Sequence, residues 1–247
     1  MRIERNGPVA LLRMENGKAN AISATLLERL DGLIAQLGDA RAAVITGQGS
    51  AFCAGLDLPA LADLDRPTMR GFIRRFDAVM LRIFELPIPL IAAVNGHAVA
   101  GGCVLALQAD VRIGADREAR IGLNETQLGI GLPAPVVEIL RWQVPGSSLA
   151  PLALEGRLVS PREALQLGLL HELVSEAELL PRALQRASAL AALPAAGLRM
   201  VKDSLRKPAA AAARANEDAE SEHWLDTWFS PESQQRLKET AARLKKT

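Results

Sequence analysis

The stretch Asn95-Gly96-His97-Ala98-Val99-Ala100-Gly101-Gly102-Cys103 does most to define the fold of this chain. It follows the apolar, strand-like run Leu90–Val94 and opens a predicted helix, so its glycines make the turn between the two. A second turn of this kind, Ala51-Phe52-Cys53-Ala54-Gly55-Leu56-Asp57-Leu58, follows the predicted strand Ala42–Gly47. The unit of strand, glycine-rich turn and helix therefore occurs twice, without clear sequence repetition.

These turns predict a site that stabilises negative charge. A helix that starts directly after a turn leaves backbone N–H groups free in front of it. Two such turns can converge on one oxygen atom and stabilise charge that develops there. A third segment, Ile121-Gly122-Leu123-Asn124-Glu125-Thr126-Gln127-Leu128-Gly129-Ile130, supplies a carboxylate. An oxyanion hole and one glutamate base together suffice to move a proton next to a carbonyl. Alone, Glu125 would more often be a solvated surface group.

Composition narrows the class of protein. The chain has 247 residues, 49% of them hydrophobic and 23% charged, which fits one large domain or a domain with a small appendage. A net charge of +1 argues against nucleic acid as the main partner. Cys53 and Cys103, both in apolar contexts, favour a reducing, cytoplasmic setting over a disulfide framework.

Membrane and metal sites are not expected. No apolar stretch reaches membrane-spanning length, and the first residues lack the apolar core of a signal peptide. The three histidines, His97, His171 and His223, are far apart and match no metal spacing. We therefore expect no metal site.

Periodicity predicts the remaining elements. A hairpin turns at Asn6-Gly7-Pro8, and an amphipathic helix runs between Ser23 as N-cap and Gly38 as C-cap. Residues 59–66 are predicted to form a surface loop that can cover a site, before a helix over 68–86. The later chain is mainly helical, with helices predicted over 133–143, 147–155, 161–167, 176–192, 195–206 and 209–229, and a last one capped by Ser230. We expect a core over 1–190 and a helical region over 191–247.

These motifs resemble the crotonase family, the enoyl-CoA hydratase/isomerase superfamily, over essentially the whole chain. The segments 51–58 and 95–110 are close to its two oxyanion segments, and their pairing at this separation is specific. The resemblance implies an α/β fold, a spiral of β-β-α turns. It also implies trimers, or a dimer of trimers, built through C-terminal helices, and acyl-CoA thioesters as ligands.

The resemblance also assigns roles to residues. The N–H groups of Leu56 and Gly101 would hold the thioester oxygen. Glycine suits position 101 because a Cβ there would crowd a thioester against the backbone. Backbone near Ala54 would contact the adenine amine, and Lys18-Ala19-Asn20-Ala21 would line the pantetheine channel. Asp57 is counted with these CoA-binding residues, although an Asp just after a glycine turn is usually a helix N-cap.

Position 104 separates the possible reactions. A hydratase of this family carries a second glutamate three residues after the oxyanion glycine, and here that residue is Val104. Valine can neither activate water nor donate a proton. With Glu125 present, the chain looks most like the short-chain Δ3,Δ2-enoyl-CoA isomerases of unsaturated fatty-acid β-oxidation, which need no cofactor beyond the CoA of the substrate.

Two alternatives stay open. One is another crotonase-type enzyme, an acyl-CoA thioester hydrolase or a weak enoyl-CoA hydratase. The other is a member that binds acyl-CoA without catalysis. Trp224, Trp228 and Phe229 suggest one buried helix face, which serves core or subunit packing by default and the acyl pocket as an alternative.

Overall fold

A six-stranded sheet begins with the predicted hairpin. The computed structural model describes residues 1–17 and 19–245, with residues 217–219 described by their backbone alone. Strands β1 (Arg2–Asn6) and β2 (Val9–Met14) pair antiparallel across a turn at Gly7, whose φ is +55°. Strands β3 (Ala42–Gly47), β5 (Leu90–Val94), β7 (Val111–Ala115) and β9 (Glu172–Val174) then add in parallel, in the order β1-β2-β3-β5-β7-β9.

A second, three-stranded sheet gives the fold its spiral. Its parallel strands are β4 (Ala51–Cys53), β6 (His97–Val99) and β8 (Ile121–Gly122). Each follows directly after one strand of the large sheet: β4 after β3, β6 after β5 and β8 after β7. These three turns of the chain therefore each add one strand to each sheet in the same order, as in the expected spiral of β-β-α turns.

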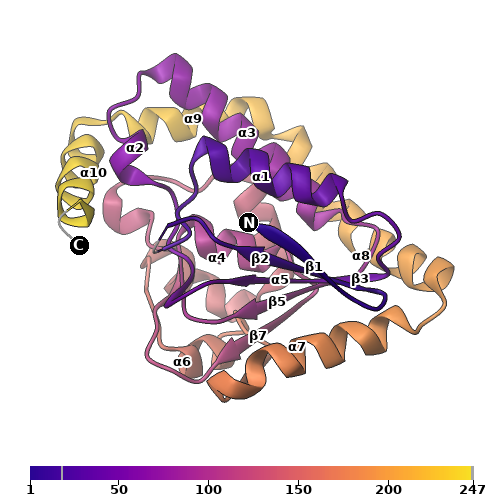
Figure 1. Ribbon diagram of the computed structural model, residues 1–247. Helices are drawn as coiled ribbons and strands as arrows, with labels where there is room; N and C mark the ends of the chain where they lie inside the picture. Colours follow the sequence, from indigo (N-terminus) through magenta and orange to yellow (C-terminus); the bar gives the residue numbers. More distant parts are fainter. Residues whose placement is uncertain (18, 246–247) are drawn as a thin grey trace.

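Helices cover both faces of the large sheet (Figure 1). On one face lies α7 (Glu176–Ala191), whose alanines at 183, 187 and 191 allow close approach to β2, β3, β5 and β7. The opposite face packs into the main core, with α1 (Ala24–Ala35), α3 (Arg66–Phe84) and α4 (Gly101–Leu107). The other helical segments are α2 (Leu58–Leu61), α5 (Ala134–Gln143), α6 (Pro161–Gln166), α8 (Ala195–Ala215), α9 (Glu217–Trp228) and α10 (Pro231–Leu244), with short 3-10 turns at Thr126–Leu128 and Gly146–Ser148 and a π-helical turn at Ala150–Leu154.

Two helix starts agree with their predicted caps. The side chains of Ser23 and Ser230 accept hydrogen bonds from N–H groups in the first turns of α1 and α10. The predicted C-cap at Gly38 is wrong, because α1 ends earlier, with Gln36 as its C-cap. Gly38 does adopt a positive φ, +56°, in the turn that follows.

The C-terminal helices differ from the prediction in one important way. The break expected between 195–206 and 209–229 is absent, because α8 runs through Pro208 to Ala215. Buried ion pairs secure α8 to the core: Lys202 Nζ lies 2.7 Å from Asp110, and the Arg206 guanidinium lies 2.8 Å from the same carboxylate. Arg206 also donates to the carbonyls of Phe84 and Gln108. These contacts keep the helix in place past the proline.

Two other segments are more structured, or structured differently, than predicted. Residues 59–66 do not form a plain surface loop, since α2 includes Leu58 and Leu61, both buried, and α3 already begins at Arg66. Residues 147–155 form the 3-10 and π-helical turns instead of one α-helix. The first correction matters for function, because Leu58 borders the cavity described next.

Candidate active site

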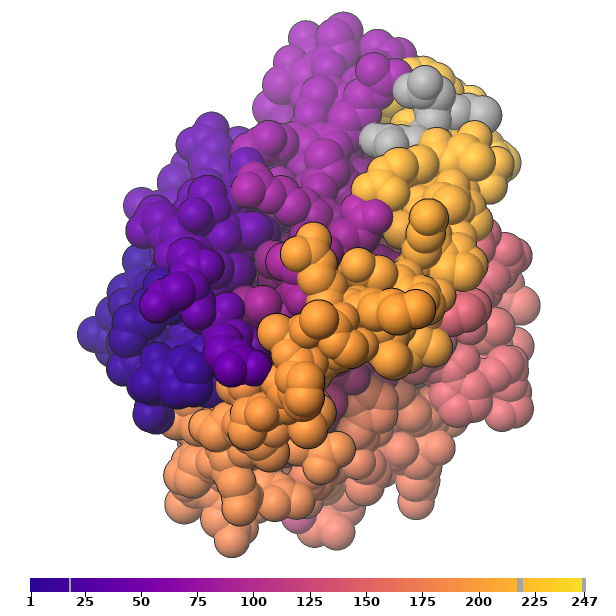
Figure 2. Space-filling view, turned by 90° about the vertical axis from the view of Figure 1, so that its right-hand side faces the viewer, coloured from indigo at the N-terminus to yellow at the C-terminus, as the bar shows by residue number. Residues whose placement is uncertain are grey.

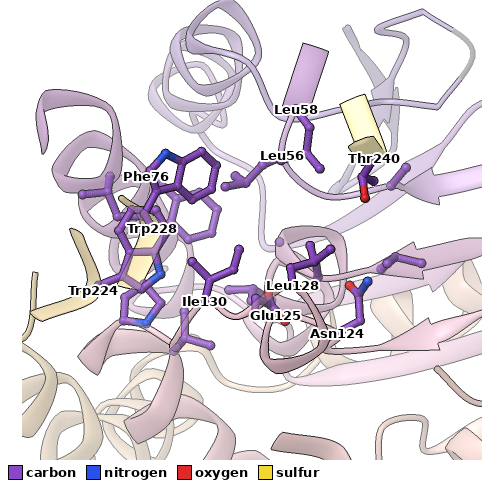
Figure 3. Close-up of a pocket in the computed structure, with 18 of the residues that line it drawn as sticks. Leu56, Leu58, Phe76, Asn124, Glu125, Leu128, Ile130, Trp224, Trp228 and Thr240 are labelled. Carbon is purple, nitrogen blue, oxygen red and sulfur yellow. The ribbon is translucent and has the colours of Figure 1, made fainter. Parts of the chain in front are cut away.

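One cavity collects residues from both glycine-rich turns and from the acidic segment. Its volume is about 190 Å³, somewhat larger than the roughly 150 Å³ cavity that holds benzene in an engineered protein. Figure 3 shows Trp224, Trp228 and Phe76 on one side, Leu56 above and Glu125 below. The full lining is Ala54, Leu56, Leu58, Ile73, Phe76, Val99, Ala100, Gly101, Val104, Asn124, Glu125, Leu128, Ile130, Pro133, Val136, Trp224, Trp228, Thr240 and Leu244.

The first turn presents the Leu56 amide. Ile22 donates its N–H to the carbonyl of Gly55 (2.7 Å), and Asp57 donates to the carbonyl of Ile22 (3.0 Å). These two bonds use the Gly55 carbonyl and the Asp57 N–H, the backbone groups before and after Leu56. In a parallel pairing the residue between two such groups points its own N–H to the other side, so the Leu56 N–H faces away from Ile22. No hydrogen bond within residues 1–17 and 19–245 uses that N–H. Gly55 makes the turn possible, since its φ is +88° and a Cβ would lie 2.8 Å from the carbonyl of Val99.

The second turn presents the Gly101 amide through a strained residue. Ala100 has a φ of +50° and a ψ of −123°, a conformation that L-residues rarely adopt. Such strain costs about 1–3 kcal/mol and gathers at functional sites. Ala100 is held there by its N–H, which donates to Gly122 (2.8 Å), and by its carbonyl, which accepts from Val104 (3.0 Å). The Gly101 N–H, at the first position of α4, donates to no group in the described part of the chain.

The glycine that packing requires is Gly102 and not Gly101. A Cβ at Gly102 would lie 1.9 Å from the carbonyl oxygen of Cys53, an impossible contact. A Cβ at Gly101 would instead meet the ends of the Ile22, Leu56 and Phe76 side chains at 3.2–3.6 Å. The absent Gly101 side chain thus leaves room beside two residues that line the cavity, whereas Gly102 lets α4 approach β4.

Glu125 places a buried carboxylate in this cavity. It precedes the 3-10 turn at Thr126–Leu128, and its carbonyl accepts from the N–H groups of Leu128 (2.9 Å) and Ile130 (3.0 Å). The residue is partly accessible, but its Oε2 is buried and has no hydrogen-bond partner in the described structure. Burial raises the pKa of Glu125 from 4.5 to about 7. A carboxylate with this pKa exchanges protons readily near neutral pH.

Apolar and aromatic side chains form the rest of the cavity wall. Trp224 and Trp228 stack with their ring centroids 5.1 Å apart, and both are buried. They therefore pack in the core and also line the cavity, so both interpretations of the aromatic helix face apply. Val104 lines the same cavity and is 2% exposed.

Of the predicted CoA-binding residues, only Ala54 is found in the cavity lining of the described structure. The Ala54 N–H donates to the carbonyl of Ala19 (3.0 Å). Ala19, Ala21 and Asp57 are not among the residues that line the cavity within the described ranges. Lys18 lies outside the described residues. Asp57 holds the N-cap position of α2, but its side chain makes no capping hydrogen bond.

Sequence reasoning missed the contribution of Asn20. It is fully buried, with a φ of +51°, and its side-chain amide donates to the carbonyls of Ala51 and Phe52. Asn20 thereby holds the predicted pantetheine segment against β4. The only feature of the sequence that pointed to this backbone conformation was the residue type, because Asn tolerates a positive φ better than most residues.

The two cysteines, and two of the histidines, lie in surroundings that fit a structural role. Burial raises the pKa values of the Cys53 and Cys103 thiols to about 12, and for Cys103 the charge of Glu125 adds to the rise. His97 accepts from the N–H of Arg120, and His171 contacts the buried guanidinium of Arg112. In the described part of the chain, no three His, Cys, Asp or Glu side chains lie close enough to share a metal ion.

Comparison with known proteins agrees with this geometry. A sequence model of the enoyl-CoA hydratase/isomerase family matches residues 4–244, and the chain belongs to that family. The mitochondrial enoyl-CoA delta isomerase 1 of Homo sapiens is 31% identical over 243 residues, which cover 96% of this chain and 80% of the relative. A putative enoyl-CoA hydratase of Thermus thermophilus is 38% identical over 191 residues, covering 74% of this chain and 73% of the relative.

The fold is also similar to that of a solved structure. The crystal structure of human mitochondrial Δ3,Δ2-enoyl-CoA isomerase matches with a TM-score of 0.94 and 29% identity, over 99% of this chain and 98% of that one. The α/β spiral with C-terminal helices is therefore confirmed. None of the described helices is both long and apolar enough to cross a membrane.

Proposed function

We propose that this protein is an isomerase that converts 3-enoyl-CoA thioesters to 2-enoyl-CoA. The observation that carries the proposal is the pair Glu125 and Val104. Both line one cavity, and Glu125 is the only acidic residue among the described residues that line it. One carboxylate suffices for a double-bond shift, because the proton that it takes from one carbon can be returned to another.

The reaction follows from this arrangement in two proton transfers. The N–H groups of Leu56 and Gly101 bind the thioester oxygen. Glu125 removes a proton from C2, and the electron pair of that C–H bond delocalises toward the oxygen to give a dienolate. Protonated Glu125 then returns the proton to C4, which leaves the double bond between C2 and C3. A general base contributes roughly 10²–10⁴-fold, and each oxyanion donor about 2.7–4 kcal/mol.

The comparisons support this reaction without deciding it. The human relative and the human structure are isomerases by name, while the Thermus relative is named a putative hydratase. Hydration of 2-enoyl-CoA is therefore the second candidate. The buried Asn124 Oδ1, which lacks a hydrogen-bond partner in the described structure, could accept from a water molecule beside Glu125.

A substrate panel tests the proposal. The protein is incubated separately with 3-enoyl-CoA and 2-enoyl-CoA esters of several chain lengths, and isomerisation, hydration and free CoA are measured. We expect isomerisation to dominate, and Glu125→Gln to abolish it while thioester binding stays nearly intact. Free CoA as the main product would indicate a thioester hydrolase, and binding without turnover would indicate a non-catalytic member. Full activity in Glu125→Gln would exclude the proposed mechanism.

The CoA-binding residues are part of the same proposal. Ala54 would contact the adenine amine through its backbone, beside Asp57, and the segment with Lys18, Ala19 and Ala21 would line the pantetheine channel. The hydrogen bond between Ala54 and Ala19 supports this grouping, because it joins the two segments. A bulky residue at position 19 is expected to weaken CoA binding, as measured by calorimetry with free CoA.

We also propose assembly into trimers through the C-terminal helical region. Helix α8, orange in Figure 2, lies across an exposed face of the subunit, and Met200, Val201 and Leu205 on it are 71%, 59% and 56% exposed. Exposed apolar side chains grouped in this way are typical of subunit interfaces. Sedimentation should give a trimer or a dimer of trimers, and Val201→Glu should shift it toward monomer.

A further inference from the structure

The turn that carries Glu125 is held from outside by two hydroxyl groups of the C-terminal helices. On the α9 side, the Gly131 N–H donates to Thr227 Oγ1 at 3.0 Å. On the α10 side, Ser233 Oγ donates to the carbonyl of Gly129 at 2.8 Å. These partners are 96 and 104 residues away from the turn in the sequence. The contacts are therefore tertiary and do not belong to the turn itself.

The hydrogen bonds within the turn leave two backbone groups for the C-terminal helices, the Gly129 carbonyl and the Gly131 N–H. Its internal bonds run from Ile130 N–H to the Glu125 carbonyl and from Gly129 N–H to the Thr126 carbonyl. The Gly129 carbonyl and the Gly131 N–H are then taken up by α10 and α9. Gly129 has a φ of +79°, and a Cβ there would lie 2.6 Å from Ser233 Oγ, so only glycine allows this approach.

Thr227 joins two parts of the site. Its hydroxyl accepts from Gly131 and donates to the carbonyl of Trp224 at 2.7 Å. Trp224 forms part of the aromatic cavity wall, and Gly131 follows the turn of Glu125. One hydroxyl therefore fixes the base relative to the wall against which an acyl chain would lie. A similar relay runs from Ser230 Oγ through Ser233 Oγ to Gly129.

We propose that Thr227 and Ser233 are positioning residues, which hold the Glu125 turn so that its carboxylate faces the Leu56 and Gly101 amides. The inference rests on the proposed function of Glu125 as the base. Misplacing a catalytic group by about 1 Å can cost about 10²-fold in rate. A hydroxyl that fixes the backbone six residues after the base controls such a displacement.

Helix α9 does not depend on Thr227 for its place. On its outer side, Glu222 pairs with Arg70, with a closest N–O distance of 2.5 Å, and Asp226 pairs with Arg66 at 2.6 Å. On its inner side, Leu225 and Trp228 are fully buried. Removing the Thr227 hydroxyl should therefore leave α9 packed in place and the protein folded. The Glu125 turn would lose one of its two hydrogen bonds to the C-terminal helices.

Loosening this turn has a specific electrostatic consequence. Burial keeps the pKa of Glu125 high, at about 7, so a turn that admits water should lower it toward 4.5. Of the titratable groups near the carboxylate, the Cys103 thiol has a pKa of about 12 and stays uncharged over the range of interest. Arg236 donates to the Gln127 carbonyl on the outer rim of the turn.

The test compares Thr227→Val, which is nearly isosteric, with Thr227→Ser, which restores the hydroxyl. We expect Thr227→Val to lower kcat/KM for 3-enoyl-CoA about 10- to 100-fold with unchanged affinity for 2-enoyl-CoA. The acid limb of its pH–kcat/KM profile should move to lower pH, and Thr227→Ser should recover both. Ser233→Ala should act in the same direction. Ser221→Ala, which removes a buried hydroxyl elsewhere on α9, should behave as the unchanged protein.

Two results would overturn the inference. One is a Thr227→Val protein with unchanged kcat/KM and pH midpoint. The other is a loss of activity that only follows the unfolded fraction seen by circular dichroism, with an unmoved pH midpoint. Glu125→Gln is measured in parallel: if it stays active, the proposed function fails, whereas an inactive Glu125→Gln beside an unaffected Thr227→Val overturns the positioning role alone.

Discussion

Replacing Glu125 by Gln should stabilise the folded protein at alkaline pH even though it removes the proposed base. The pKa of this carboxyl rises from 4.5 to about 7 on folding, because its Oε2 is buried without a partner in the described structure. Between these two pH values the folded state holds a proton that the unfolded state has released. Stability therefore falls as pH rises from about 4.5 to about 7, and the loss is complete above that.

The size of the effect follows from the same two pKa values. At about 1.4 kcal/mol per pH unit, the interval from 4.5 to about 7 corresponds to about 3 kcal/mol at pH 8. Roughly 1 kcal/mol of this is already present at pH 5, above the unfolded-state pKa. Glutamine does not titrate, so the stability difference between Glu125→Gln and the unchanged protein should grow by about 2–3 kcal/mol from pH 5 to pH 8.

Urea unfolding at both pH values measures this difference, with tryptophan fluorescence as the signal and protein concentration held constant. Comparing the two pH values cancels any constant effect of exchanging a carboxyl for an amide. A stability difference that is the same at pH 5 and pH 8 would refute the reasoning, because it would mean that the carboxylate is hydrated in the folded protein. Loss of isomerase activity in the same variant would then have to be explained without a tuned base.

Three further predictions concern the same cavity. First, kcat/KM should rise about tenfold per pH unit below pH 7 and level off above pH 8, since the base must be ionised; a profile flat down to pH 5 would contradict the raised pKa of Glu125. Second, Val104→Glu should add hydration of 2-enoyl-CoA to the activity and lower stability by burying a second carboxylate; unchanged product ratios would show that position 104 does not reach the reacting carbons. Third, Gly102→Ala should prevent folding, since its Cβ would overlap the Cys53 carbonyl, whereas Gly101→Ala should fold and lose activity; circular dichroism and the isomerase assay separate the two, and a folded Gly102→Ala would disprove the close contact.

Local features of the fold were predictable. The hairpin around Gly7 and the caps at Ser23 and Ser230 depend on residues a few positions apart, and the structure has them where expected. The strand-turn-helix unit was predictable for the same reason. Predictions failed where distant contacts override local signals, as at Pro208, which α8 passes because the core binds Arg206.

The site was only partly readable from the sequence. Glu125, Leu56 and Gly101 were predicted as a group, and all three line one cavity. Their roles in catalysis stay predictions. Thr227 and Ser233 gave no signal, because an isolated hydroxyl in a helix has no recognisable pattern, and their partners lie about a hundred residues away in the chain.

The sequence by itself determined which groups are available: two glycine-containing turns, one glutamate, and a valine at position 104. The turns follow from residue type and short-range geometry, whereas the meaning of Val104 rests on the family resemblance, which implies a second glutamate there in hydratases. Only the tertiary structure decided that the groups share one cavity, that burial raises the Glu125 pKa to about 7, and that α9 and α10 hold its turn. Burial and long-range hydrogen bonds exist only after distant segments have packed together, so no local pattern can encode their strength.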